Sequence, residues 1–154
     1  MRILYTFVFM FMMMVGQIGA QTIIIGTGGS NTDGFGNDPI DDYFKYMRYQ
    51  TVYTATELST AGLTPYDILT GLGFSVSQSP GTLANYTIRI GHTTATNAAA
   101  HISAASTEVK SAFSYTPTVV SAGSFDMITF STNFVWNGTD NIFIDICTGS
   151  NTFA

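Results

Sequence analysis

The clearest pattern of alternating apolar and polar positions lies in residues 124–148. One side of this extended segment would carry isoleucines and the other side polar residues: Ile142, Ile144 and Ile146 against Asp145 and Cys147. A period of two is typical of a strand with one buried face. Asn137-Gly138 lies upstream, and both residues tolerate the positive φ of a tight turn. The segment therefore predicts a hairpin around which a sandwich closes.

Further segments have the composition of short strands. They are residues 22–25, 44–54, 72–76, 85–90 and 108–115. Residues 85–90 have the cleanest alternation, whereas residues 44–54 are apolar or aromatic on both faces, which predicts a central strand or one packed on both sides. Short strands separated by Gly-, Pro- and Asn-rich turns predict an all-β fold, an antiparallel and jelly-roll-like β-sandwich.

Two short stretches favour helical turns instead of strands. Residues 55–63 predict a brief helix that Thr56 caps and Gly62 ends in the left-handed conformation. Residues 93–105 are small and weakly patterned, and Asn97 could cap a single helical turn there.

The first twenty residues have the order of a secretory signal peptide. Arg2 precedes an apolar run, residues 3–15, and small residues follow up to Ala20. The run is shorter than the ~20 residues of a membrane-spanning helix. We therefore expect residues 1–20 to be a signal peptide and residues 21–154 to form one β-sandwich domain, secreted or at the cell surface, with no integral membrane span after cleavage. The alternative is an uncleaved anchor or a buried helix.

Charge and cysteine content narrow the class of partner. After residue 20, four basic residues stand against ten acidic residues, a net charge of −6. Such a surface repels phosphate backbones, so we expect no nucleic-acid partner. Cys147 is the single cysteine and can form no disulfide within the chain. In an apolar strand it is expected to act as a small, half-buried hydrophobic residue.

An acidic, glycine-rich loop over residues 26–42 is a candidate metal site. Asp33, Asp38 and Asp41 offer the oxygen ligands that Ca²⁺ prefers. Their spacing does not match the twelve-residue helix–loop–helix calcium motif. The sequence thus predicts a possible structural calcium ion, and the alternative is a solvated loop.

Signatures of catalysis are missing from the sequence. The chain has no G-x-S-x-G elbow, and its two histidines, His92 and His101, are accompanied by no Cys-x-x-Cys pair. Acidic residues cannot be paired for glycoside hydrolysis from sequence alone. We therefore expect a protein that is not an enzyme.

Aromatic residues suggest a glycan site. Tyr49 and Tyr53 can share one face of a regular strand, and Trp136 beside Asn137 could stack on a sugar at the rim of the sandwich. These four residues are the candidate ligand-binding residues. The alternative for Trp136 is that its ring fills the core at the end of the hairpin.

Four stretches together resemble a known module. They are ATELSTAGLTPYDILTGLGFSV, LANYTIRIGHTTAT, SYTPT and ITFSTNFVWNGTDNIFIDIC, in that order. This order resembles a β-sandwich module of secreted and cell-surface Bacteroidota proteins, many of them exported by the type IX secretion system. The resemblance covers residues 21–148 and implies a non-catalytic, jelly-roll-like surface domain. Such modules usually continue beyond the cysteine strand, so the resemblance implies a chain truncated at its C-terminal end, with an open sheet edge.

Three functions follow from this sequence. The first is a non-catalytic adhesion module that binds a glycan, a cell-surface polymer or a neighbouring protein domain. The second is a structural spacer or subunit that self-associates through an open sheet edge. The third is an accessory domain of a secreted hydrolase.

Overall fold

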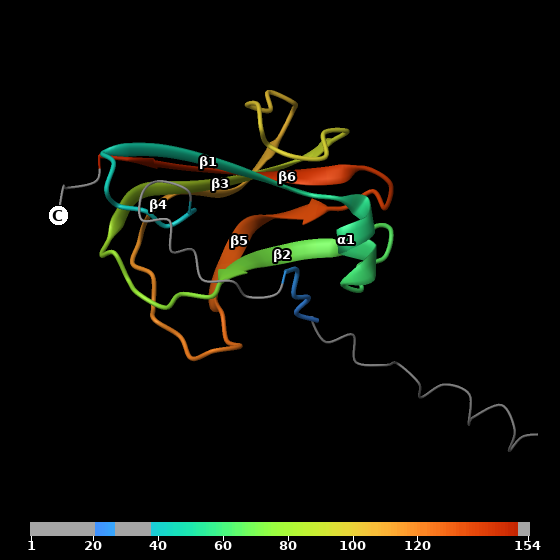
Figure 1. The fold of residues 1–154 in the computed structure, drawn as a ribbon. Coiled ribbons are helices and arrows are strands. Elements are labelled where there is room, and N and C mark those ends of the chain that lie inside the picture. Colours follow the sequence, from blue (N-terminus) through green and yellow to red (C-terminus); the bar gives the residue numbers. More distant parts are fainter. Residues whose placement is uncertain (1–20, 27–37, 151–154) are drawn as a thin grey trace, which may run out of the picture.

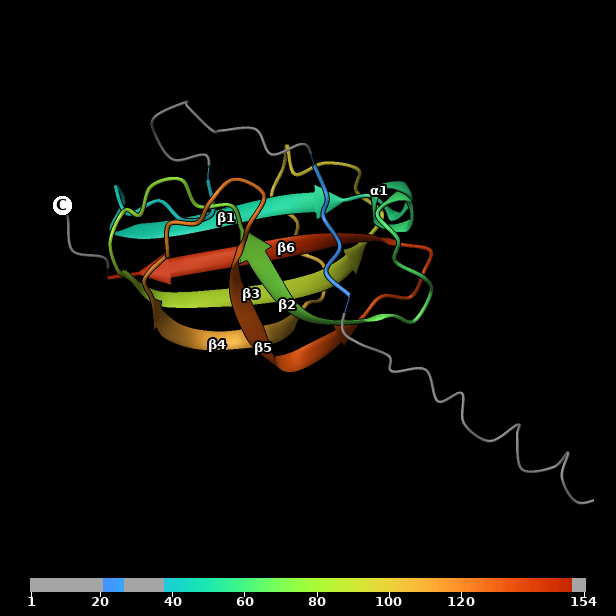
Figure 2. The same cartoon turned by 90° about the horizontal axis from the view of Figure 1, so that it is seen from below.

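The computed structural model describes residues 21–26 and 38–150, which form two antiparallel sheets and one short helix. The elements in chain order are β1 (Tyr46–Tyr53), α1 (Ala55–Thr60), β2 (Ile68–Phe74), β3 (Leu83–Thr93), β4 (Thr107–Tyr115), β5 (Asp126–Val135) and β6 (Asn141–Gly149). One sheet has the order β1-β6-β3-β4, and the other is β2-β5. Figure 1 shows the sheets as two layers with α1 at one end, and in Figure 2 β2 and β5 cross the larger sheet obliquely. The predicted all-β, sandwich-like fold is confirmed.

The core lies between these layers and is built by alternating residues. The inward residues of β3 and β6 are almost fully buried: Tyr86, Ile88, Ile90, Ile142, Ile144 and Ile146. From the smaller sheet, Ile128, Phe130 and Phe134 of β5 pack against them. Burial of such side chains is the main driving force for closing the two layers. The predicted alternation in both strands is confirmed.

The predicted hairpin around Asn137-Gly138 is wrong. β5 pairs with β2, whereas β6 pairs with β1 and β3, so residues 136–140 carry the chain from one sheet to the other. Gly138 does have a positive φ of +83°. The oxygen Oδ1 of Asn137 accepts bonds from the backbone N–H groups of Thr139 (3.0 Å) and Asp140 (2.9 Å), which turns the chain. A turn dipeptide predicts a reversal but not which strands pair across it.

Two strand predictions near the N-terminus also need correction. Among the described residues, β1 pairs with β6 alone, so it is an edge strand and not a central strand. Its apolar residues on one face pack against the core, and its other face carries Arg48 and Gln50 toward the outside of the sheet. Residues 22–25 form no strand, although Ile23 and Ile25 pack against the core.

The helix α1 begins at Ala55, as the sequence indicated, but its cap lies two residues earlier than predicted. Its cap is Thr54, not Thr56: the hydroxyl of Thr54 accepts from the backbone N–H of Glu57 (3.2 Å), and Oε2 of Glu57 accepts from the N–H of Thr54 (2.8 Å). The bonds from the backbone and hydroxyl of Thr54 lower the pKa of Glu57. Gly62 follows the helix with φ +109°, as expected. Asn97 caps no helical turn; it accepts a bond from the N–H of Ala99 (3.0 Å).

At the end of the sandwich opposite α1, two buried tyrosines hydrogen-bond to neighbouring segments. The hydroxyl of Tyr86 donates to the carbonyl of Pro39 (2.8 Å), and that of Tyr115 donates to Oδ2 of Asp126 on β5 (2.7 Å). Burial raises the pKa of both phenols, and each is raised further by a neighbour: Tyr86 by Tyr115, and Tyr115 by Asp126. Both hydroxyls are therefore protonated donors in the fold.

We predict that these phenols make the fold sensitive to alkali. A tyrosine in an unfolded chain ionises near pH ~10, so above that pH the unfolded state loses protons that the fold retains, and stability falls. Tyr86→Phe should flatten this decline while lowering the free energy of unfolding at neutral pH by about 1 kcal/mol, through the lost hydrogen bond. Urea unfolding between neutral and alkaline pH measures both effects. Tyr46→Phe, at an exposed position, is the control; equal alkaline slopes for Tyr86→Phe and wild type would contradict the assignment.

Candidate functional site

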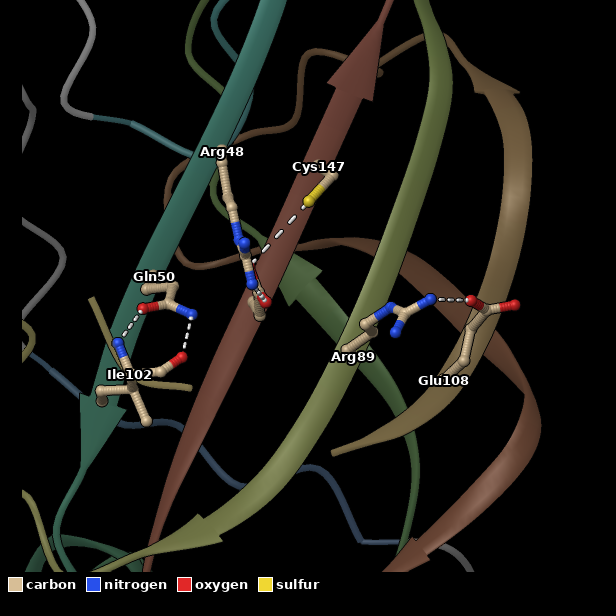
Figure 3. A network of polar contacts seen from close by, with 7 residues as sticks. Arg48, Gln50, Arg89, Ile102, Glu108 and Cys147 are labelled. Atoms are coloured by element: carbon tan, nitrogen blue, oxygen red, sulfur yellow. Dashed lines mark hydrogen bonds and ion pairs between the residues drawn. The ribbon is translucent and has the colours of Figure 1, made fainter. Parts of the chain in front are cut away.

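A groove crosses the outer face of the four-stranded sheet. It has a volume of about 780 Å³ and lies between the strands and residues 101–106. All four strands of this sheet contribute to its floor or sides, through Arg48, Asp145, Arg89 and Glu108. Figure 3 shows Arg48, Arg89 and Glu108 on the face that points away from the smaller sheet. We call this feature the outer-face groove.

The wall of the outer-face groove is fastened to the sheet. The side-chain amide of Gln50 donates to the carbonyl of Ile102 (3.0 Å) and accepts from its N–H (2.9 Å). A Cβ atom on Gly91 would collide with the carbonyl oxygen of Ala105, so only glycine permits this close approach. The segment covers Phe143, which is 1% exposed although it lies on the outer face. The groove therefore has a fixed wall.

The best-defined polar contact in the groove joins Arg48 to Asp145. Nε of Arg48 donates to Oδ1 (2.9 Å) and Nη2 donates to Oδ2 (2.5 Å), a bidentate arrangement. The Asp145 side chain is 2% exposed, whereas that of Arg48 is 51% exposed. Hydrogen bonding to Asp145 is the main cause that raises the pKa of Arg48. A buried carboxylate thus holds one edge of a guanidinium whose remainder faces solvent.

A second ion pair spans the other side of the groove. Nη2 of Arg89 lies 2.6 Å from Oε2 of Glu108, and both side chains are well exposed, at 46% and 39%. In the sheet register Arg89 is paired with Asp145 on one side and with Glu108 on the other. Exposed pairs of this kind contribute only about 0–1 kcal/mol, because water screens them.

Cys147 lies beside these charges but is not activated by them. Its Sγ is 4.0 Å from Oδ1 of Asp145. Burial is the largest cause that raises its pKa and Asp145 adds to it, while Arg48 and Arg89 oppose the shift. A raised pKa keeps the thiol protonated, and the protonated form is a poor nucleophile.

The aromatic residue proposed for sugar stacking is inside the protein. Trp136 is 0% exposed, and its Nε1 donates to the carbonyl of Asp140 (2.8 Å). Its ring therefore has no free face for a ligand, and the expectation of a stacking site at the rim is wrong; the core-filling alternative holds. The amide of Asn137 is held within the same turn, where Nδ2 donates to Oδ2 of Asp140 (2.7 Å).

Tyr49 and Tyr53 share one face of β1, as the spacing predicted. That face packs against the core, and burial raises the pKa of Tyr53, with Tyr49 as the next cause. Both rings are half-buried on the inner side of the sheet, so they lie on the face opposite the outer-face groove.

The calcium prediction is only partly within the described residues. Asp33 lies outside them. Oδ1 of Asp38 accepts from the N–H of Ile40 (2.9 Å) and Oδ1 of Asp41 accepts from that of Tyr43 (2.7 Å), so each carboxylate caps a local turn. In residues 21–26 and 38–150 no cluster of three or more His, Cys, Asp or Glu side chains could hold a metal ion. A calcium ion at this loop stays a prediction.

The groove residues were not singled out by sequence. The one available signal was an acid, Asp145, inside the apolar run of β6. Its partner Arg48 is 97 positions away, and only the strand register brings the two together. Tyr66 was also missed: it is 74% exposed with φ +71° in a tight turn, a conformation that costs free energy in a non-glycine residue.

We predict strong coupling between Arg48 and Asp145. Arg48→Ala leaves a buried, unpaired carboxylate and should lower the free energy of unfolding by about 2 kcal/mol. The double variant Arg48→Ala/Asp145→Leu should recover most of that loss, because the unpaired charge is gone. Chemical denaturation of the two single variants and the double variant measures the coupling. Additive losses would contradict it.

Comparisons with known proteins identified no relative. No protein-family model matches the chain, and no curated protein or solved structure matches it either. The resemblance to secreted Bacteroidota modules therefore stays a prediction. Within the described residues, no helix is both long and apolar enough to cross a membrane.

Proposed function

We propose that this protein is a non-catalytic, secreted or cell-surface β-sandwich module that binds a glycan through the outer-face groove. The observation that carries the proposal is the buried carboxylate of Asp145, which fixes the exposed guanidinium of Arg48 on an otherwise regular sheet face. Buried ion pairs add little to stability compared with apolar packing. The Arg48–Asp145 pair is therefore better explained as a means of positioning the Arg48 guanidinium for binding a ligand.

The groove offers the kinds of group that sugars require. Hydroxyl side chains from Thr87, Ser106 and Ser111 line it, together with the exposed apolar surface of Ala112. Ligand sites combine such apolar surface with a few placed polar groups. An open groove across several strands suits an extended polymer better than a small enclosed ligand.

The state of the titratable groups favours binding over catalysis. Each carboxylate of the groove, Asp145 and Glu108, is engaged by an arginine. The thiol of Cys147 has a raised pKa. Nucleophilic catalysis by cysteine needs the thiolate, so this protonated thiol is poorly suited to it, and both carboxylates already bind an arginine.

Location outside the cell rests on the sequence of the first twenty residues. Their charged, apolar and small-residue order is that of an export signal. The resemblance to secreted surface modules agrees with this. Residues 1–20 lie outside the described part of the chain.

We predict that filling the groove abolishes glycan binding. Ala112 is exposed and lines the groove, so Ala112→Trp should be tolerated by β4 while obstructing the site. On a polysaccharide array, wild type should bind at least one glycan, and Ala112→Trp should weaken that binding by at least about tenfold.

Thr132→Trp provides the matched control for this obstruction. Thr132 is an exposed position of β5, on the smaller sheet, and outside the groove. Its variant should bind as wild type does. A wild-type protein that binds no glycan, or equal losses in both tryptophan variants, would contradict the proposal.

A second candidate function is assembly through the smaller sheet. Among the described strands, β2 and β5 have no neighbour other than each other, so both leave an open edge. Ile68 and Val135 are opposite each other in register and are 57% and 47% exposed. An open edge beside exposed apolar side chains favours pairing with another chain.

This second candidate makes its own prediction. If the edge pairs, wild type should be a dimer or larger by size-exclusion chromatography with light scattering. Ile68→Lys should then give a monomer, because an edge lysine opposes strand addition. Val119→Lys changes a similarly exposed apolar residue elsewhere and should leave the assembly intact. A monomeric wild type at high concentration would refute this candidate.

A further inference from the structure

We infer that the outer-face groove selects sugars that carry carboxylate groups, and that Arg48 and Arg89 are their contacts. This inference rests on the proposed glycan-binding function. It adds the chemical class of the ligand, namely a uronic-acid polymer.

The first argument is the placement of positive charge. After residue 20 the chain has four basic residues against ten acidic ones. Two of the four, Arg48 and Arg89, line the same groove, from strands on either side of β6. Half of the basic residues that follow residue 20 are therefore at one site, where Asp145 and Glu108 pair with them and the exposed parts of both guanidiniums can contact an anionic group.

The second argument is the way Arg48 is held. Asp145 uses the Nε and Nη2 edge of the guanidinium, and within the described residues Nη1 has no hydrogen-bond partner. Figure 3 shows this side chain lying across β6 on the open face of the sheet. Because the carboxylate beneath it is buried, the guanidinium is oriented before a ligand arrives, which reduces the entropic cost of binding.

The third argument is the replaceable partner of Arg89. Glu108 is exposed and its ion pair with Arg89 is screened by water, so exchange for a ligand carboxylate costs little. Arg89 binds Glu108 through Nη2 alone, and its guanidinium can bind an incoming carboxylate in a planar, bidentate geometry. In this interpretation Glu108 occupies the position that a uronic-acid carboxylate takes in the complex.

The net charge argues against a denser polyanion. Residues 21–154 have a net charge of −6 and repel duplex nucleic acid, which carries one phosphate per ~1.7 Å of its axis. A uronic-acid polymer carries one carboxylate on each sugar, surrounded by hydroxyls, and the neighbouring Thr87 and Ser106 can bond those hydroxyls.

The experiment compares polygalacturonate oligomers with the same oligomers after chemical reduction of their carboxylates. Wild type should bind the acidic form at least about tenfold more tightly. Raising NaCl from about 50 mM to about 300 mM should weaken that binding, because exposed charges are screened. Alginate oligomers serve as a second acidic probe, since the linkage between sugars is not part of the inference.

Three variants test the assigned contacts. Arg89→Gln should weaken binding of the acidic oligomer by at least about tenfold. Glu108→Gln should strengthen it by a few-fold, because the competing internal carboxylate is removed, and should leave binding of the reduced oligomer unchanged. Lys110→Gln removes a cation on the same strand but outside the groove, and should have no effect. Thermal melting of each variant confirms that it is folded.

The outcomes separate the inference from the function on which it rests. Equal binding of acidic and reduced oligomers, with no effect of Arg89→Gln, overturns the acidic-sugar inference and leaves glycan binding intact. Weaker acidic binding in Glu108→Gln also overturns it. If the glycan bound on the array is neutral and Ala112→Trp weakens its binding, the proposed function stands while this inference fails.

Discussion

The structure depends on burying both faces of one strand, β6. Its isoleucines close the core against the smaller sheet, while Phe143 and Asp145 on the opposite face are covered as well. Phe143 is apolar and suits burial; Asp145 is charged and would be costly to bury alone. The bidentate contact with Arg48 makes this burial tolerable. Since β6 pairs with both β1 and β3, the position of this strand sets the position of the whole larger sheet.

Most of the fold could be predicted from sequence because alternation is a local signal. The period of two in β3 and β6 identified strands and their buried faces without any knowledge of partners. Pairing is not local, and there the prediction failed. Asn137-Gly138 gives the same signal for a hairpin as for a passage between sheets. Here β5 pairs with β2, and backbone bonds of Trp136 with Tyr66 and Asp67 continue that pairing beyond Ile68 and Val135. The edge position of β1 was hidden for the same reason.

The candidate site was much harder to predict than the fold. Sequence drew attention to Trp136, whose large ring is used in the core instead. The residues that line the outer-face groove come from four strands and a covering segment, and they become neighbours only once the register is fixed. Gly91 is an example: nothing local shows that a backbone carbonyl, that of Ala105, must pass so near it. Close approach of distant backbone is a tertiary property that no local pattern encodes.

The pairing of Tyr46 with Gly149 has a mechanical consequence. β1 enters the larger sheet at the same end at which β6 leaves it, and the two strands are hydrogen-bonded neighbours. Tension applied across these two residues would separate the strands from that end, breaking the ladder one bond after another. A sheet loaded in this direction yields at low force, unlike one in which all bonds are sheared together. A chain pulled at Tyr46 and Gly149 would therefore extend at low force instead of resisting as a rigid unit.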